Sequence, residues 1–277
     1  MKEKTYDEPV TGNYTKYNKP GIVQNNTVTY KEVIMGMFIL KLIGYAIIAY
    51  FMSTAIHELG HVICGLLNHW KFFVLVVGPF KLYRKNLNDK IRFGIEKNPT
   101  FWGGYGGAVP EKFDDNVMKI FSRVLLAGPI ASIVFGIVFI TILILTGNDF
   151  AMMVGFIALG EGVMCILPMK LQTGMLYNDG TRYLRIHRGG QTADEEKAMY
   201  SMSLDNLLNG QAEIYDEEMV EILCRSEDAS YKYYGLYLLY HNAEERKDEA
   251  EMDRIRREMS EMKTKVSSYI AKSCVLD

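Results

Sequence analysis

The chain has 277 residues and a formal net charge of −2, so its charge balance gives no reason to expect a nucleic-acid partner. The charge is unevenly divided: residues 1–186 carry 19 Lys and Arg against 13 Asp and Glu, whereas residues 187–277 carry 12 against 20. Val124–Leu145 is a run of 22 residues without a charge, long enough to cross a bilayer core of about 30 Å as a helix. The composition therefore argues against a simple soluble globule.

The N-terminal region predicts a tail followed by a long helix. Residues 1–32 are polar and lack the early apolar core of a signal peptide, so we expect a flexible tail. From Val33 to Leu67 the chain is almost continuously apolar and contains no proline. We expect one helix here, whose first two-thirds spans a membrane. A hairpin of two spans is the alternative, but it would require two unusually short helices.

Residues 71–110 predict a small β region. Lys81–Arg84 and Ile91–Ile95 alternate polar and apolar residues on either side of a turn that contains Asn and Asp, which is typical of a β-hairpin. A glycine-rich segment follows at 101–110. Its backbone is able to bend sharply or to approach another chain closely.

Two further spans, Val124–Leu145 and Phe150–Met169, are joined by a short loop at 146–149 without Lys or Arg, whereas residues 71–123 carry ten of them. The positive-inside rule therefore predicts that residues 70–120 and everything after 170 are cytoplasmic and that the loop is outside. A single first span then puts the N-terminus outside.

The C-terminal third predicts a soluble helical domain. Met252, Ile255, Met259 and Met262 recur at spacings of three and four, which indicates one face of a helix. Three or four helices are expected in this region. The expected fold class is a mainly α, integral membrane protein. It comprises the tail at 1–32, a three-helix transmembrane core with a small β-hairpin region at 33–186, and a soluble α-helical domain at 187–277.

The sharpest chemical feature is an H-E-x-x-H motif formed by His57, Glu58 and His61. Histidines four residues apart lie one turn apart on one face of a helix, so both imidazoles can reach one metal ion. Zinc suits this set because it accepts nitrogen and oxygen ligands and leaves one position for a water molecule, which Glu58 can hold. Three polar side chains within an apolar span are costly without a function, which argues against an incidental polar turn.

A catalytic zinc site needs a third ligand from elsewhere in the chain. His69 lies eight residues after His61, about 12 Å along a helix, which is too far. The four cysteines are scattered and form no C-x-x-C pair. Asp179 is the best candidate, because Gly180 gives the chain freedom to aim the carboxylate. Glu161 is the alternative, either as a ligand or as a hydrogen-bond partner of a ligating histidine.

The H-E-x-x-H motif, the Ala-Gly-Pro triplet at 127–129 and the Asp-Gly pair at 179–180 together resemble the site-2 protease family of intramembrane zinc metalloproteases. The resemblance covers roughly residues 33–186. It implies a three-helix catalytic core, a membrane-associated β-hairpin region at 71–110, and substrates that span a membrane. It also implies a zinc ion held by His57, His61 and Asp179, with Glu58 as the general base.

Some features depart from the family pattern. Ser132 stands where members usually have Asn shortly after the Ala-Gly-Pro triplet, and Cys165 stands where they usually have Asn three residues before Pro168. The interval from Pro168 to Asp179 is also longer. These departures concern substrate positioning and transition-state stabilisation more than metal binding. They motivate an alternative, a catalytically inactive membrane adaptor that acts through its C-terminal helical domain.

The expected function is that of an intramembrane zinc endopeptidase that cuts a peptide bond in or near the membrane, for regulated signalling or peptide processing. The expected partners are a membrane-embedded or membrane-associated protein or peptide substrate and the lipid bilayer, with the C-terminal domain as a candidate surface for a protein partner. We expect a multi-pass protein of a bacterial cell membrane with a cytoplasmic C-terminal domain. A zinc-dependent transporter component is less favoured, because the chain has three spans and a catalytic type of motif.

Overall fold

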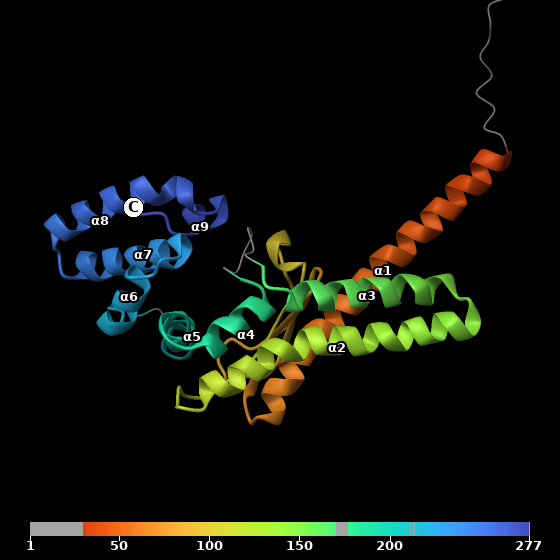
Figure 1. Cartoon of the computed structure of the whole chain (residues 1–277), viewed down its shortest axis with the longest axis horizontal. Coiled ribbons are helices and arrows are strands. Elements are labelled where there is room, and N and C mark those ends of the chain that lie inside the picture. Colours follow the sequence, from red (N-terminus) through yellow and green to blue (C-terminus); the bar gives the residue numbers. More distant parts are fainter. Residues whose placement is uncertain (1–29, 170–176, 211, 213, 277) are drawn as a thin grey trace, which may run out of the picture. The chain divides into compact units, whose positions relative to one another are not determined.

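The computed structural model describes residues 30–169, 177–210, 212 and 214–276 (Figure 1). This part of the chain is mainly helical with one small antiparallel sheet, as the sequence predicts. Most of the predicted tail at 1–32, and most of the interval between Pro168 and Asp179, lie outside the described residues. The chain divides into two compact units, residues 1–41 and 42–277. The predicted division at residues 32 and 186 stays a prediction.

Among the described residues, three helices are long and apolar enough to cross a membrane, and they correspond to the three predicted spans. They are α1 (Tyr30–Leu67), α2 (Val117–Thr146) and α3 (Asp149–Ile166). The first is a single uninterrupted helix, so the alternative of a hairpin is wrong. Gly147 ends α2 in a left-handed conformation, and the Asn148 side chain caps α3. In consequence, α2 and α3 run antiparallel and side by side (Figure 1).

The sheet has four antiparallel strands in the order β3-β2-β1-β4. Their bounds are Lys71–Val77 (β1), Phe80–Tyr83 (β2), Arg92–Ile95 (β3) and Tyr105–Val109 (β4). The predicted hairpin is confirmed as the β2–β3 pair. The sequence pattern did not assign β4 as a strand, because three glycines in the five residues 104–108 mask any alternation. A short 3-10 helix, Pro99–Phe101, precedes β4, which forms one edge of the sheet.

After α3, the described residues continue in α4 (Asp179–Arg188) and then in five further α-helices. These five are α5 (Gln191–Asn209), α6 (Glu217–Cys224), α7 (Ala229–Glu245), α8 (Glu249–Met262) and α9 (Ser268–Ser273), with a 3-10 turn at Lys263–Lys265. The expectation of three or four helices was too low, because α6 and α9 are too short to show a clear helical period. Fully buried side chains such as Leu223 and Ile255 form the core of this region.

Candidate metal centre

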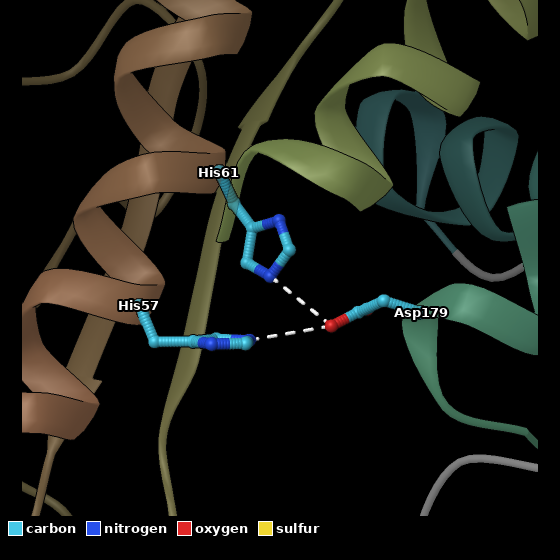
Figure 2. A group of neighbouring side chains, drawn as sticks. All are labelled: His57, His61 and Asp179. Atoms are coloured by element: carbon cyan, nitrogen blue, oxygen red, sulfur yellow. Dashed lines mark hydrogen bonds and ion pairs between the residues drawn. The ribbon is translucent and has the colours of Figure 1, made fainter. Parts of the chain in front are cut away.

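Two histidines of α1 and one aspartate of α4 converge on one point (Figure 2). His57 and His61 lie on successive turns, are 4% and 7% exposed, and have ring centroids 4.9 Å apart. Asp179 is the first residue of α4. One donor atom from each of the three side chains lies within 4.8 Å of the other two. The structure thus brings Asp179 next to His57, which lies 122 positions earlier in the sequence, and next to His61.

Hydrogen bonds on the far side of each imidazole ring set its orientation. The Nδ1 of His61 donates to the backbone carbonyl oxygen of Val124 at 2.7 Å, and the Nδ1 of His57 lies 3.1 Å from the hydroxyl of Ser132. The Nε2 atoms therefore face Oδ2 of Asp179, at 3.2 Å from His57 and 3.5 Å from His61. Partners of this kind fix the tautomer and the direction of a ligating histidine.

The two distances from the histidine nitrogens to the Asp179 oxygen fit a tetrahedral metal ion. With metal–ligand bonds of about 2.0–2.1 Å, two ligand atoms of a tetrahedral zinc ion lie about 3.3–3.4 Å apart, and the two Nε2–Oδ2 distances bracket this value. The neutral His61 ring keeps its proton on Nδ1, because its partner there is a carbonyl oxygen. The lone pair of Nε2 then faces a carboxylate oxygen, and a metal cation between the two atoms removes their repulsion. Two imidazoles and one carboxylate are also a set of donors that suits zinc.

The start of α4 is tied to the end of α3. Asn178 caps α4 by accepting from the backbone N–H of Thr181 at 3.1 Å, and its amide donates to the carbonyl oxygens of Met164 and Leu167. The neighbouring glycine, Gly180, is buried in the helix, and a Cβ there would overlap the carbonyl of Ile166. The expectation that Gly180 frees the chain to aim Asp179 is wrong, since this glycine instead allows close packing of the two helices.

The Ala-Gly-Pro triplet lets α2 approach the motif on α1. A Cβ at Gly128 would overlap the imidazole of His61, so no larger residue fits there without moving the ring. The same close approach brings the Val124 carbonyl, one turn earlier on α2, into reach of His61.

Glu58 is buried between the motif and the sheet. Glu58 directly follows His57 in the sequence, and its side chain lies against the glycine-rich strand β4. A Cβ at Gly106 would lie 2.9 Å from both the Cβ and the backbone oxygen of Glu58. The strand therefore needs glycine at this position to pass so close to α1.

Glu161 lies outside the group of donor atoms that surrounds Asp179. It is half-buried on α3 and accepts hydrogen bonds from two hydroxyls of α1, those of Ser53 and, at 3.4 Å, Thr54. These residues precede His57 by about one turn. In the described residues, Glu161 thus accepts its hydrogen bonds from a serine and a threonine. The partners that the sequence suggested for it were a metal ion or a ligating histidine.

Some residues of the site were not expected from the sequence. Ser132, which drew notice only as a departure from the family pattern, is the hydrogen-bond partner of His57. The position of Ser53 could have been predicted, because Ser53, His57 and His61 follow one another at intervals of four residues and so lie on one helix face. His69 and Cys165 are not among the converging donors in the described part of the chain.

Comparison with known proteins agrees with the resemblance. No curated protein and no solved structure matches the chain. The model of peptidase family M50, the site-2 protease family, matches residues 45–273, which is well over half of the chain and includes α1 from Tyr45 onward and the helices α2–α9. Members of this family are membrane proteins and, in general, zinc metalloproteases. The chain therefore belongs to peptidase family M50.

Proposed function

We propose that this protein is an active intramembrane zinc endopeptidase that hydrolyses a peptide bond in or near the membrane. The observation that carries the proposal is the convergence of His57, His61 and Asp179, in which both distances from histidine nitrogen to carboxylate oxygen suit a tetrahedral ion. Family membership supports the metallopeptidase class. The contact between Nδ1 of His57 and the Ser132 hydroxyl, which can accept the Nδ1 proton, supports intact metal binding despite the departure from the family pattern.

Zinc, when bound, lowers the pKa of a coordinated water to about 7 and polarises the scissile carbonyl. Glu58 is the group that moves the proton. Its carboxylate accepts the proton of the attacking water and then delivers it to the amine nitrogen of the leaving peptide. Burial of Glu58 against β4 keeps bulk water away from this carboxylate. The ion would be bound by His57, His61 and Asp179. The hydrogen-bond partners of the two histidines fix the orientation of their rings.

The edge strand β4 supports a mode of substrate binding. A substrate helix must unwind first, because its carbonyl groups are bonded within the helix. The extended segment can then pair with β4, the edge strand, as in other cases of strand addition to a sheet. Because β4 passes directly against Glu58 at Gly106, pairing there brings a substrate backbone to the general base.

Exposed apolar side chains support insertion into a bilayer. Ile144 and Leu145 at the end of α2 are 77% and 78% exposed, as is expected for side chains that face lipid. We further propose the orientation predicted by the basic residues at 71–123: the 146–149 loop lies outside, and the sheet and the C-terminal helices are cytoplasmic.

The orientation predicts the outcome of labelling in intact cells. With the four natural cysteines replaced by serine, Asn148→Cys reacts with a membrane-impermeant thiol reagent, whereas Lys85→Cys in the sheet region and a C-terminal cysteine react only after the cells are opened. Labelling of the C-terminal cysteine in intact cells would reverse the proposed orientation.

The proposed activity predicts that Glu58→Gln abolishes cleavage and leaves zinc bound. We expect a rate loss of about 10²–10⁴-fold, which is the usual contribution of a general base. The assay uses purified full-length protein in lipid vesicles with a membrane-anchored protein encoded by a neighbouring gene, tagged at both ends. Zinc is measured in parallel, and Glu221→Gln, an exposed carboxylate on α6, serves as the matched control.

Two outcomes would contradict the proposal. Substantial cleavage by Glu58→Gln would show that another group moves the proton. A wild-type protein that is loaded with zinc and cleaves none of the neighbouring membrane proteins would favour the inactive adaptor.

A further inference from the structure

A buried ionic network joins α4 to α5. The side chain of Glu196 on α5 is fully buried and accepts from two guanidinium groups of α4. The Nε of Arg182 lies 2.9 Å from one of its oxygens, and the Nε of Arg185 lies 2.9 Å from the other. Arg185 also pairs with Glu195, whose side chain is 4% exposed. Two carboxylates thus meet two guanidinium groups, so the charges within the network are balanced.

The helix α7 completes this network. The hydroxyl of Tyr231 donates to Glu196, and the guanidinium of Arg185 lies over the ring of Tyr231, 4.4 Å from its centroid. The ring of Tyr177, just before α4, stacks on Tyr231 and lies under the same guanidinium at 4.8 Å. A buried network whose members are all bonded is rigid, because each lost partner leaves a desolvated charge.

The helix that carries Asp179 is short and is held at both ends. With ten residues, α4 is about 15 Å long. At its first turn, Thr181 contacts the backbone of Met169 at 2.7 Å. Arg182 lies only three residues after Asp179, so the network begins within one turn of the carboxylate. A change in this network therefore rotates or tilts the segment that presents Asp179.

The helix α5 in turn contacts α2 and the segment just after α1. The ring of Tyr200 stacks on Phe121 of α2 with centroids 4.2 Å apart, and it lies 6.2 Å from Trp70, just after α1. The guanidinium of Arg182 lies over the same Phe121 ring at 4.9 Å. Glu196 thus lies on a helix that packs against α2 and the end of α1, and from there it can define the position of α4 relative to α1.

We infer that Glu196 is a positioning residue for the metal centre: through Arg182 and Arg185 it sets α4, and through α4 it sets the Asp179 carboxylate opposite His57 and His61. The inference rests on the proposed function to the extent that it takes Asp179 as a ligand. It gives the C-terminal helices a role in the metal site, since a partner that displaces α5 or α7 changes the affinity for zinc.

The test is the zinc affinity of Glu196→Gln in the purified full-length protein, measured by competition with a chromophoric chelator. Glutamine has a similar shape but loses the charge, so the two guanidinium groups are no longer balanced and α4 shifts. We expect zinc binding that is about 10–100-fold weaker, as is typical when a partner that orients metal ligands is lost. Glu258→Gln, which breaks a pair with Lys232 between α7 and α8, is the matched control with unchanged affinity.

A second readout separates positioning from a general loss of stability. The visible spectrum of the cobalt(II)-substituted protein reports the geometry of the ligands in the folded fraction alone. We expect an altered spectrum for Glu196→Gln and a wild-type spectrum for Glu258→Gln. Tyr231→Phe removes a single hydroxyl from the network, and we expect a smaller loss of zinc affinity in the same direction. If Glu196→Gln does not fold, Tyr231→Phe decides.

Wild-type zinc affinity and a wild-type cobalt spectrum in the folded Glu196→Gln and Tyr231→Phe variants would overturn the inference. The ligand assignment fails separately, if Asp179→Ala binds zinc as tightly as the wild type. None of these measurements requires cleavage of a substrate, so the role of Glu196 can be tested even if the protein is an inactive adaptor.

Discussion

The chain contains two buried polar clusters that differ in how their charges are balanced. The cluster around Glu196 sets two carboxylates against two guanidinium groups, and every charge has a partner. The cluster around the H-E-x-x-H motif contains the carboxylates of Glu58 and Asp179, with Glu161 nearby on α3. Among the described residues, no ion pair joins any of these three carboxylates to a lysine or an arginine.

The difference indicates where a cation belongs. A buried carboxylate is costly unless a positive charge or several hydrogen bonds compensate for it. The network at Glu196 meets this condition with its own residues, so its role is to fix helices. The cluster at the motif contains no lysine or arginine partner for its carboxylates in the described residues, and a divalent ion between His57, His61 and Asp179 would provide the positive charge.

The largest expected effect comes from removing a carboxylate from the unbalanced cluster. We predict that Asp179→Ala loses the bound zinc, because two imidazoles alone are too few ligands. Glu161→Gln keeps the zinc, because Ser53 and Thr54 hydrogen-bond to this carboxylate away from the ligand group. Both variants are purified with the wild type and assayed for metal content. If Asp179→Ala retains full zinc and Glu161→Gln loses it, Glu161 is the ligand instead.

A smaller effect is expected from a residue that orients a ligand. Ser132→Ala removes the hydroxyl that contacts Nδ1 of His57, and we predict about tenfold weaker zinc binding in a chelator competition. Ser122→Ala is the matched control, because this hydroxyl of the same helix donates to the backbone oxygen of Lys119, within its own helix. Equal affinities for the two variants would mean that Ser132 does not orient the histidine.

Much of the architecture could be predicted from the sequence, because long apolar runs and a helical metal motif are local signals. Periodicity and length predict the three long apolar helices, the β2–β3 hairpin and the placement of His57 and His61 on one helix face. The proposed third ligand, Asp179, follows from its place in the Asp-Gly pair just beyond the third apolar run and from the family resemblance, and the structure places it opposite both histidines.

The other parts depend on contacts between segments that are distant in the sequence. No local pattern connects Ser132 with His57, which is 75 residues away, or Val124 with His61. The strand β4 was missed because its glycines serve close packing against Glu58 and mask the alternation of a strand. Glu196 is one acidic residue among several in an acidic region, so the sequence did not indicate that it would be fully buried among arginines.

The most direct test of the central claim is zinc-edge X-ray absorption spectroscopy of the purified full-length protein. The proposed ligands predict two imidazole nitrogens and a carboxylate oxygen at about 2.0–2.1 Å, with a further oxygen from water. The imidazole scattering should fall by half in His61→Ala if that variant still holds zinc. A sulfur ligand at about 2.3 Å, which would point to a cysteine such as Cys165, or a zinc ion without imidazole ligands, would contradict the assignment.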